Sequence, residues 1–216
     1  MTNHLNLLVG GPVENWPDAL QKHQIKGDWI GVDRGNLRLI KLGIDPKYAV
    51  GDFDSLAPDE LALVEQHVQH IHHSRAEKDD TDTQLGLKAA IELFHADSVD
   101  IYGATGGRID HFLANFLMVL ELRFRMYAPK IRLIDKQNTI TYYLPGEHVI
   151  TKEPDKKYLA FVPLTPMTLT LPDEKYRLDR FPIQHPVSLS SNEFIGNKGH
   201  FEFDQGVMAV IQSSDK

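Results

Sequence analysis

The sequence predicts an α/β parallel-sheet (Rossmann-like) domain followed by an all-β antiparallel sandwich domain. In the first half, short apolar runs that end in glycine or aspartate alternate with stretches that favour helices, which is typical of βαβ units. Beyond residue 126 the pattern changes to short β-rich runs separated by turn residues, which is typical of a sandwich. A chain of 216 residues is long enough for two small domains. We therefore expect an α/β domain over 1–126 and a sandwich over 127–216.

The first half contains the expected strands and helices in alternation. The predicted strands, each with the turn that follows it, are 5–12, 28–35, 48–55, 68–74 and 98–108, and the predicted helices are 16–23, 36–42, 58–68, 81–95 and the segment after Arg108. Ligands of a parallel sheet bind at the carboxyl ends of its strands. We therefore expect the glycine and aspartate residues after these strands to share one site.

Two aspartates, Asp52 and Asp54, follow the apolar run that ends at Gly51. Residues two apart in an extended chain point to the same side, so the two carboxylates are expected to aim together. Their repulsion is relieved by a cation, and hard oxygen ligands favour Mg²⁺ shared with the phosphates of a substrate. The alternative is a solvated turn, because aspartate, glycine and serine are ordinary turn residues.

A second acidic segment leads into the helix predicted at residue 81. It contains Asp79, Asp80 and Asp82, whereas a helix N-cap needs one such residue. The excess suggests contacts with a metal ion or a ribose, and helix capping is the alternative.

The glycine-rich run 103–108 is a candidate phosphate-binding loop. Glycines before a helix let backbone N–H groups approach a phosphate, and Arg108 can fork onto it. The run matches neither the Walker pattern nor the dinucleotide-binding pattern. In the helix that follows, one face is apolar and the roughly opposite face is polar. The alternative to a binding role is that the polar face only contacts solvent, as is usual for an amphipathic helix. The apolar residues are Ile109, Leu113, Phe116 and Leu120, and the polar residues are Arg108, His111 and Asn115.

The second half is read as short strands with hairpin turns. The predicted strands are 131–134, 139–144, 148–151, 158–162, 167–171, 193–195, 200–203 and 207–212. Proline, glycine and aspartate separate several of these runs. We expect them to pair as an antiparallel sandwich.

The composition limits the classes of function. The chain has no cysteine, which excludes disulfides, thiolate metal sites and cysteine nucleophiles. Its net charge is −7 and it has no block of lysine and arginine, which disfavours a nucleic-acid partner. No apolar run approaches the length of a membrane span, and the first residues lack a signal-peptide pattern. We expect a cytoplasmic protein.

Taken together, these segments resemble the thiamine pyrophosphokinase (thiamine diphosphokinase) family. The family motifs are Asp-x-Gly, Gly-Asp-x-Asp-Ser, Lys-Asp-x-Thr-Asp, and Gly-Gly-Arg-x-Asp-His with a following Asn. The matching segments, in the same order, are Asp33-Arg34-Gly35, Gly51-Asp52-Phe53-Asp54-Ser55, Lys78-Asp79-Asp80-Thr81-Asp82, and Gly106-Gly107-Arg108-Ile109-Asp110-His111 with Asn115. A late Ser191-Asn192-Glu193 also matches, so the resemblance extends over nearly the whole chain.

The resemblance implies a homodimer that transfers a pyrophosphoryl group from Mg-ATP to the hydroxyl of thiamine, giving AMP and thiamine diphosphate. It also implies that thiamine is held between the catalytic domain of one subunit and the sandwich of the other. The chain departs from the family in the sandwich, where a Gly-Leu-Lys-Tyr or Trp variant is common and this chain has Pro172-Asp173-Glu174-Lys175-Tyr176. Tyr176 is nevertheless the expected stacking partner of the thiamine pyrimidine.

With the resemblance, the site residues fall into four groups. The catalytic residues are Asp52, Asp54, Asp79, Asp82, Arg108 and Asp110, and the metal ligands are Asp52, Asp54 and Asp82. The ATP-binding residues are Asp33, Arg34, Gly35, Lys78, Thr81, Gly106, Gly107, Arg108, His111 and Asn115. The thiamine-binding residues are Tyr176, Ser190, Ser191 and Asn192. A Mg²⁺-dependent phosphohydrolase and a non-catalytic nucleotide-binding regulator remain as alternatives.

Overall fold

The computed structural model describes residues 3–75 and 79–215, and the chain forms two compact units. Unit 1 comprises residues 1–118 and 133–136, and unit 2 comprises 119–132 and 137–216. The short segment 133–136 thus belongs with the first unit, although it lies in the second half of the sequence.

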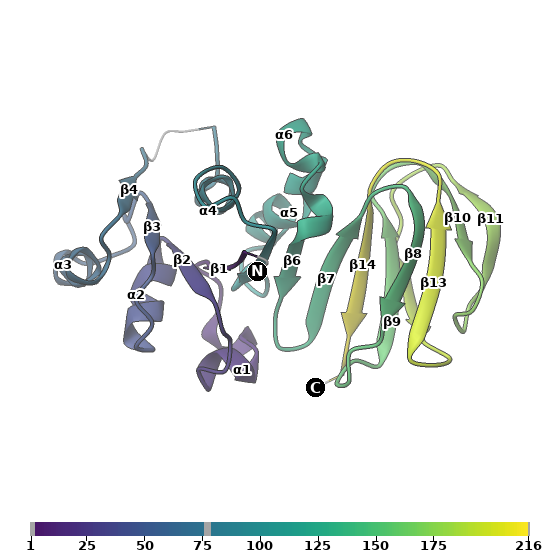
Figure 1. Cartoon of the computed structure of the whole chain (residues 1–216), viewed down its shortest axis with the longest axis horizontal. Helices are drawn as coiled ribbons and strands as arrows, with labels where there is room; N and C mark the ends of the chain where they lie inside the picture. Colours follow the sequence, from purple (N-terminus) through teal and green to yellow (C-terminus); the bar gives the residue numbers. More distant parts are fainter. Residues whose placement is uncertain (1–2, 76–78, 216) are drawn as a thin grey trace. The chain divides into compact units, whose positions relative to one another are not determined.

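Unit 1 contains a parallel sheet with helices on both faces (Figure 1). Its strands are β1 (His4–Leu8), β2 (Asp28–Val32), β3 (Tyr48–Gly51), β4 (Ile71–His73) and β5 (Ser98–Tyr102), paired in parallel in the order β5-β1-β2-β3-β4. Its helices are α1 (Asp18–Gln21), α2 (Arg34–Lys41), α3 (Pro58–His67), α4 (Asp82–Glu92) and α5 (Ile109–Leu117), with a 3-10 turn η1 (Val13–Asn15).

Two consecutive residues of β1, Leu7 and Leu8, show how the two faces of the sheet are covered. Leu8 packs with Trp16 and Leu20 under α1, in an apolar cluster that also includes Leu39 of α2. On the opposite face, a Cβ on Gly86 of α4 would meet the side chains of Leu7, Val32 and Val50 at 2.9–3.6 Å. Neighbouring strand residues point to opposite faces, so α2 and α4 lie on opposite sides of the sheet (Figure 1).

The strand order reverses once, between β1 and β5. From β1 the chain adds β2, β3 and β4 in one direction, and β5 then pairs with the other side of β1. In sheets of this kind, ligands bind at the carboxyl ends of the two strands on either side of the reversal. In this chain those ends are followed by two glycine-containing loops, Gly10-Gly11 after β1 and residues 103–108 after β5.

Several element boundaries differ from the sequence-based expectations, for local reasons. The helix expected over 16–23 is reduced to α1, which begins after Pro17. The helix expected over 81–95 ends at Glu92, and His95 beyond it has a left-handed backbone with φ 50°. The strand expected over 68–74 begins only at Ile71 and ends at His73, because these three residues are the ones that pair with β3.

Unit 2 contains two antiparallel strand sets. The first has the order β12-β9-β14-β7 and the second has the order β11-β10-β13-β8. The bounds are β7 (Asn138–Tyr143), β8 (Gly146–Thr151), β9 (Tyr158–Pro163), β10 (Met167–Leu171), β11 (Leu178–Ile183), β12 (Leu189–Glu193), β13 (Lys198–Phe203) and β14 (Met208–Ser213). A helix α6 (Leu122–Arg125), 3-10 turns η2 (Met118–Leu120) and η3 (Ala128–Lys130), and strand β6 (Ile131–Ile134) lie between α5 and β7 in the sequence.

The core of unit 2 is built from apolar residues of both strand sets. Leu159 and Phe161 of β9, Leu169 of β10, and Phe201 and Phe203 of β13 are all buried in one cluster. A sheet with a parallel part in unit 1 and a separate antiparallel sheet in unit 2 fit the predicted fold class in part. The finer description as Rossmann-like is supported only by the parallel strands of unit 1.

Two strands were not predicted correctly. The strand expected over 193–195 is instead β12, Leu189–Glu193, which shares only Glu193 with it, and β11 was missed altogether. Strand β11 lies at the edge of its sheet, contains Pro182, and exposes Asp179 and Arg180. Edge strands commonly carry charges and proline because only one side is paired. Its sequence therefore lacks the apolar alternation that marks the other strands.

No helix among the described residues is both long and apolar enough to cross a membrane.

Candidate functional site

Asp33 lies at the carboxyl end of β2, beside the end of β3. It has a left-handed backbone with φ 47°, and its N–H donates to the carbonyl of Val50 at 2.9 Å. Its carboxylate lies so close to Gly51 that a Cβ there would be 1.9 Å from Asp33 Oδ1. Gly35 is equally confined, because its Cβ would be 2.0 Å from the carbonyl oxygen of Leu8 at the end of β1. The glycines therefore bring three strand ends and the start of α2 into close contact.

Arg34 ties these strand ends to the next loop. Its guanidinium donates to the carbonyl of Ser55 and lies 3.8 Å from Glu60 Oε2 at the start of α3. The side chain therefore links the start of α2 to the segment that carries Asp54.

Asp52 and Asp54 do not lie in extended chain. Strand β3 ends at Gly51, and Phe53 between the two aspartates has φ 57° with its ring buried. The N–H of Asp54 donates to Asp52 Oδ1 at 3.1 Å, and the Asp54 side chain is exposed. The extended-chain premise was therefore wrong, because burial of Phe53 turns the backbone at that point. Left-handed backbone at non-glycine residues is strained and tends to gather at functional sites.

Asp82 is connected to the same edge through Ser74. The Ser74 hydroxyl donates to Asp82 Oδ1 at 2.9 Å, and the Ser74 N–H donates to the carbonyl of Gly51 at 2.9 Å. Thr81 caps α4, since its Oγ1 accepts from the N–H of Gln84 at 3.2 Å while Gln84 Oε1 accepts from the N–H of Thr81 at 2.8 Å. The capping alternative therefore accounts for Thr81.

The predicted site residues of this acidic segment also include Asp79 and Lys78. Asp79 is exposed and lies two residues before Thr81, the N-cap of α4, and Lys78 lies outside the described residues. Within residues 3–75 and 79–215, no three histidine, aspartate or glutamate side chains are grouped closely enough to hold a metal ion. Asp52 and Asp54 still offer the carboxylate oxygens that Mg²⁺ uses, and this ion is usually held by one or two carboxylates together with substrate phosphates.

The two glycine loops at the strand-order reversal pack directly on each other. The N–H of Gly11 donates to the carbonyl of Gly103 at 2.9 Å, and a Cβ on Gly11 would be 2.1 Å from that oxygen. The Arg38 guanidinium of α2 donates to the carbonyl of Gly11 at 2.5 Å. Gly106 has φ 76°, and a Cβ there would be 1.6 Å from Asn15 Nδ2. Close backbone packing therefore shapes the loop 103–108.

The outer end of this loop is exposed and carries an ion pair. Gly106, Gly107 and Arg108 are exposed, and the Arg108 guanidinium donates to both carboxylate oxygens of Asp110, at 3.1 and 2.5 Å. The hydrogen bond from Arg108 holds the pKa of Asp110 at about 2, and the same contact raises the pKa of Arg108. The two donors of the Arg108 guanidinium thus bind a carboxylate, and the same pair of donors matches two oxygens of a phosphate.

Helix α5 differs from the expected division into an apolar and a solvated face. His111 is exposed, but Asn115 is 7% exposed and its Nδ2 donates to the carbonyl of Ala104 at 3.2 Å. Conversely, Ile109 is 74% exposed and Leu113 is 45% exposed. The reading of this side as a solvated face was therefore wrong for Asn115, because its amide anchors the glycine loop and is buried. The apolar face was also placed wrongly at Ile109 and Leu113, which are exposed.

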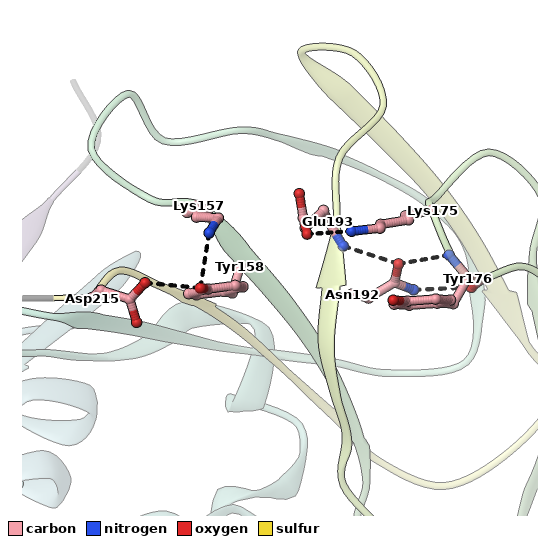
Figure 2. Close-up of polar contacts among 7 residues, drawn as sticks. All are labelled: Lys157, Tyr158, Lys175, Tyr176, Asn192, Glu193 and Asp215. Carbon is pink, nitrogen blue, oxygen red and sulfur yellow. Dashed lines mark hydrogen bonds and ion pairs between the residues drawn. The ribbon is translucent and has the colours of Figure 1, made fainter.

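In unit 2, the proposed thiamine residues lie on and beside β12 (Figure 2). Asn192 is 3% exposed, and its amide makes two hydrogen bonds of 2.9 Å to the main-chain N–H and carbonyl of Tyr176. The Tyr176 side chain is exposed, with Lys175 Nζ 5.5 Å from the centre of its ring. Ser190 and Ser191 are exposed, and Ser191 has φ 61°. Asn192 therefore holds the chain segment of Tyr176 rather than facing solvent.

Two family models match the chain. One, described as "Thiamin pyrophosphokinase, catalytic domain", matches residues 20–133, and the other, "Thiamin pyrophosphokinase, vitamin B1 binding domain", matches residues 147–208. Together they cover most of the chain. The chain belongs to the thiamine pyrophosphokinase family.

Relatives of this family match over nearly the full length. The thiamine pyrophosphokinase of Bacillus subtilis (strain 168) is 40% identical over 216 residues, which cover 98% of this chain and 99% of the relative. A solved thiamin pyrophosphokinase family protein from Enterococcus faecalis has 45% identity and a TM-score of 0.92, covering 99% of this chain and 100% of its own. The solved thiamine pyrophosphokinase from Bacillus subtilis has 36% identity and a TM-score of 0.81, with the same coverage.

The structure of this thiamine pyrophosphokinase family member also contains polar residues that the sequence analysis did not select. Thr105 Oγ1 donates to Asp135 Oδ2 at 2.6 Å, and these residues are 30 positions apart. Glu174 is 0% exposed, and neither of its carboxyl oxygens has a hydrogen-bond partner among the described residues. Only the departure from Gly-Leu-Lys-Tyr pointed to Glu174, and nothing in the sequence pointed to Asp135.

Proposed function

We propose that the chain transfers the pyrophosphoryl group of Mg-ATP to the hydroxyl of thiamine, giving thiamine diphosphate and AMP. Membership of the family supports this reaction. The structural observation that carries it is the pair of glycine loops at the strand-order reversal, beside strand ends that bear Asp33 and Asp52. That edge of a parallel sheet is where nucleotides bind.

The glycine loop supplies the contacts to the phosphates. Gly106 and Gly107 are exposed residues ahead of the N-terminus of α5, where a helix favours negative charge, and their backbone N–H groups are proposed to donate to phosphate oxygens. Arg108 forks onto the phosphate chain and exchanges its contact with Asp110 for a contact with phosphate oxygens. His111 lies one turn further along the exposed side, and Asn115 contributes by holding the loop.

The nucleotide lies along the ends of β2 and β3, near Asp33, Arg34 and Gly35. Thr81, at the start of α4, is proposed to approach it. Lys78 lies outside the described residues, and its proposed role of neutralising phosphate charge rests on the family motif alone. Pyrophosphoryl transfer needs mainly positioning and neutralisation of charge, so these residues act by orienting the phosphates in line with the attacking hydroxyl.

We propose that Asp52 and Asp54 hold Mg²⁺ together with phosphate oxygens of ATP. Asp82, the third ligand expected from the sequence, is not grouped with them closely enough in this structure to hold the same ion, so Asp82 and Asp79 are proposed to act only once the phosphates are bound. Carboxylate oxygens at the end of β3 fit this ion, which supplies charge neutralisation for the phosphate oxygens of the donor. Ser74 holds the Asp82 carboxylate toward the end of β3.

Thiamine is proposed to stack on Tyr176, whose ring is exposed, with Ser190 and Ser191 offering hydroxyl groups and Asn192 holding Tyr176 in place. We further propose that the protein is a homodimer, which the exposed Ile109, Leu113 and Leu117 of α5 support. A contiguous exposed apolar strip on a helix is typical of a protein interface. A cytoplasmic location is proposed because a cysteine-free chain suits a reducing compartment.

Nucleotide analysis of the pure protein with Mg-ATP, with and without thiamine, tests this function. We expect AMP and thiamine diphosphate in equal amounts, and only when thiamine is present. ADP or free phosphate formed without thiamine would instead favour a phosphohydrolase. ATP binding without any product would favour a nucleotide-binding regulator.

A further inference from the structure

The glycine loop, residues 103–108, is held at successive positions by different elements. The carbonyl of Gly103 accepts from the N–H of Gly11 at 2.9 Å, and the carbonyl of Ala104 accepts from Asn115 Nδ2 at 3.2 Å. These two contacts hold the main chain where the loop leaves β5. Beyond Ala104 the loop becomes exposed, and the next residue is Thr105.

Thr105 is anchored by a carboxylate that lies far away in the sequence. Its hydroxyl donates to Asp135 Oδ2 at 2.6 Å, and Asp135 is 8% exposed. A hydrogen bond to an ionised carboxylate is stronger than one between neutral groups, and more so when water is excluded. Thr105 therefore has a directed contact at the point where the loop turns outward.

The segment that carries Asp135 is itself hydrogen-bonded to Asn15, which also contacts the glycine loop. The N–H of the next residue, Lys136, donates to the carbonyl of Asn15 at 2.8 Å. The Asn15 side chain in turn lies against Gly106, where a Cβ would be 1.6 Å from Nδ2. Asp135 and Asn15 thus support consecutive residues of the loop. These contacts also explain why residues 133–136 belong to unit 1.

We propose that Asp135 is a positioning residue for the donor nucleotide, acting through Thr105. The Asp135 carboxylate accepts the hydrogen bond that the Thr105 hydroxyl donates, so the Thr105 side chain orients the loop and does not donate to a phosphate. The consequence is that the N–H groups of Gly106 and Gly107 face the phosphate chain in one fixed orientation. This inference rests on the proposed function, because it assumes that the loop binds the phosphates of ATP.

The test compares variants of the two residues by calorimetric Mg-ATP binding without thiamine, and by KM for each substrate. Thr105→Val removes the hydroxyl at nearly constant shape, and Asp135→Ala removes its acceptor. We expect each to weaken ATP binding about tenfold, since small misplacements of binding groups are costly. The KM for thiamine should stay unchanged. Thr105→Ser and Asp135→Asn, which keep a donor and an acceptor, should restore most of the affinity.

A double-mutant cycle isolates the contact. If Asp135 acts through Thr105, the Thr105→Val/Asp135→Ala protein should bind ATP no more weakly than either single variant. Effects that simply add, or an unchanged ATP affinity in folded Thr105→Val, would overturn the proposal.

The chain offers a matched control in unit 2. Thr139 Oγ1 donates to Glu153 Oε2 at 2.8 Å, and Thr139 is 5% exposed. Thr139→Val should lower the melting temperature without changing ATP affinity. An equal loss of ATP affinity in Thr139→Val would show a general structural effect and would also overturn the proposal. The proposed function is judged separately, by whether the wild-type protein forms AMP with thiamine.

Discussion

Asn192 pairs with the main chain of Tyr176 as a neighbouring strand would. Its Oδ1 accepts from the Tyr176 N–H and its Nδ2 donates to the Tyr176 carbonyl, both at 2.9 Å (Figure 2). The same Oδ1 also accepts from the N–H of Glu193 at 2.9 Å. One buried amide therefore holds the segment that presents the exposed ring of Tyr176.

This relationship predicts the effect of Asn192→Asp. The variant replaces the Nδ2 donor with an oxygen that faces the Tyr176 carbonyl, and an unmade buried hydrogen bond costs about 1–3 kcal/mol. We expect the KM for thiamine to rise about tenfold while the KM for ATP stays unchanged. Asn197→Asp, in an exposed turn, is the control. A higher KM for ATP with an unchanged KM for thiamine would contradict the role given to Tyr176.

Asp54→Asn tests the proposed Mg²⁺ ligands. The side chain is exposed, so the fold should be intact, whereas turnover should fall by more than about a hundredfold because a metal-binding carboxylate is lost. Circular dichroism checks the fold and product analysis measures the rate. Asp59→Asn, also exposed and at the start of α3, should have near-normal activity. Near-normal activity in folded Asp54→Asn would remove this residue from the metal site.

Arg108→Lys tests the phosphate fork. Lysine keeps the charge but lacks the planar pair of donors, so kcat/KM for ATP should fall by roughly ten- to a hundredfold. The matched control is Arg123→Lys, because Arg123 also donates to a carboxylate two residues away, from Nε to Glu121 Oε2 at 2.8 Å. An unchanged rate in Arg108→Lys would exclude Arg108 from phosphate binding.

Glu174 predicts a loss of stability as the pH rises. Burial raises the pKa of its carboxyl from 4.5 to about 7, and Asp173 adds to this effect while His200 opposes it. The folded protein therefore holds the proton more tightly than the unfolded chain. The stability gained from this proton is fully present below pH 4.5 and is lost as the pH rises through about 7.

Glu174→Leu removes this dependence. The shift in the pKa of the carboxyl corresponds to roughly 3 kcal/mol in the free energy of unfolding. The variant should therefore be more stable than the wild type by about that amount at pH 8, and its advantage over the wild type should be smaller at pH 5. Urea unfolding at both pH values measures this. Glu65→Leu, at an exposed position of α3, is the control. If the difference in free energy of unfolding between Glu174→Leu and the wild type is the same at pH 8 and at pH 5, the carboxyl is not held protonated.

The exposed apolar side of α5 predicts self-association. Leu113→Glu places a charge among Ile109 and Leu117, so a dimer formed there should dissociate to monomers without unfolding. Light scattering after size-exclusion chromatography measures the mass. The control is Leu93→Glu, another exposed leucine, which follows α4. A wild-type monomer, or a Leu113→Glu dimer, would contradict this interface.

Most of the fold was predictable, because its elements are encoded locally. The apolar runs that became β1, β2, β3 and β5 end where glycine or aspartate follows, and Thr81 was recognisable as a cap residue. Strand β11 was not predictable, because an edge strand with Pro182 lacks the apolar alternation. That Asp33, Gly35 and Gly51 gather at one edge of the sheet was also predictable, since parallel strands bring their carboxyl ends to one edge. The roles given to the residues there stay predictions.

The sequence by itself determined the order of the elements, the family motifs and the residue types available at the strand ends. Only the tertiary structure decided what those residues do locally. It placed Asp33 against Gly51, turned the backbone at Phe53, and joined Thr105 to Asp135 across 30 residues. It also buried Asn192 against Tyr176 and left Glu174 without a partner among the described residues. Such contacts depend on how distant segments pack, and neither local propensity nor residue spacing contains that information.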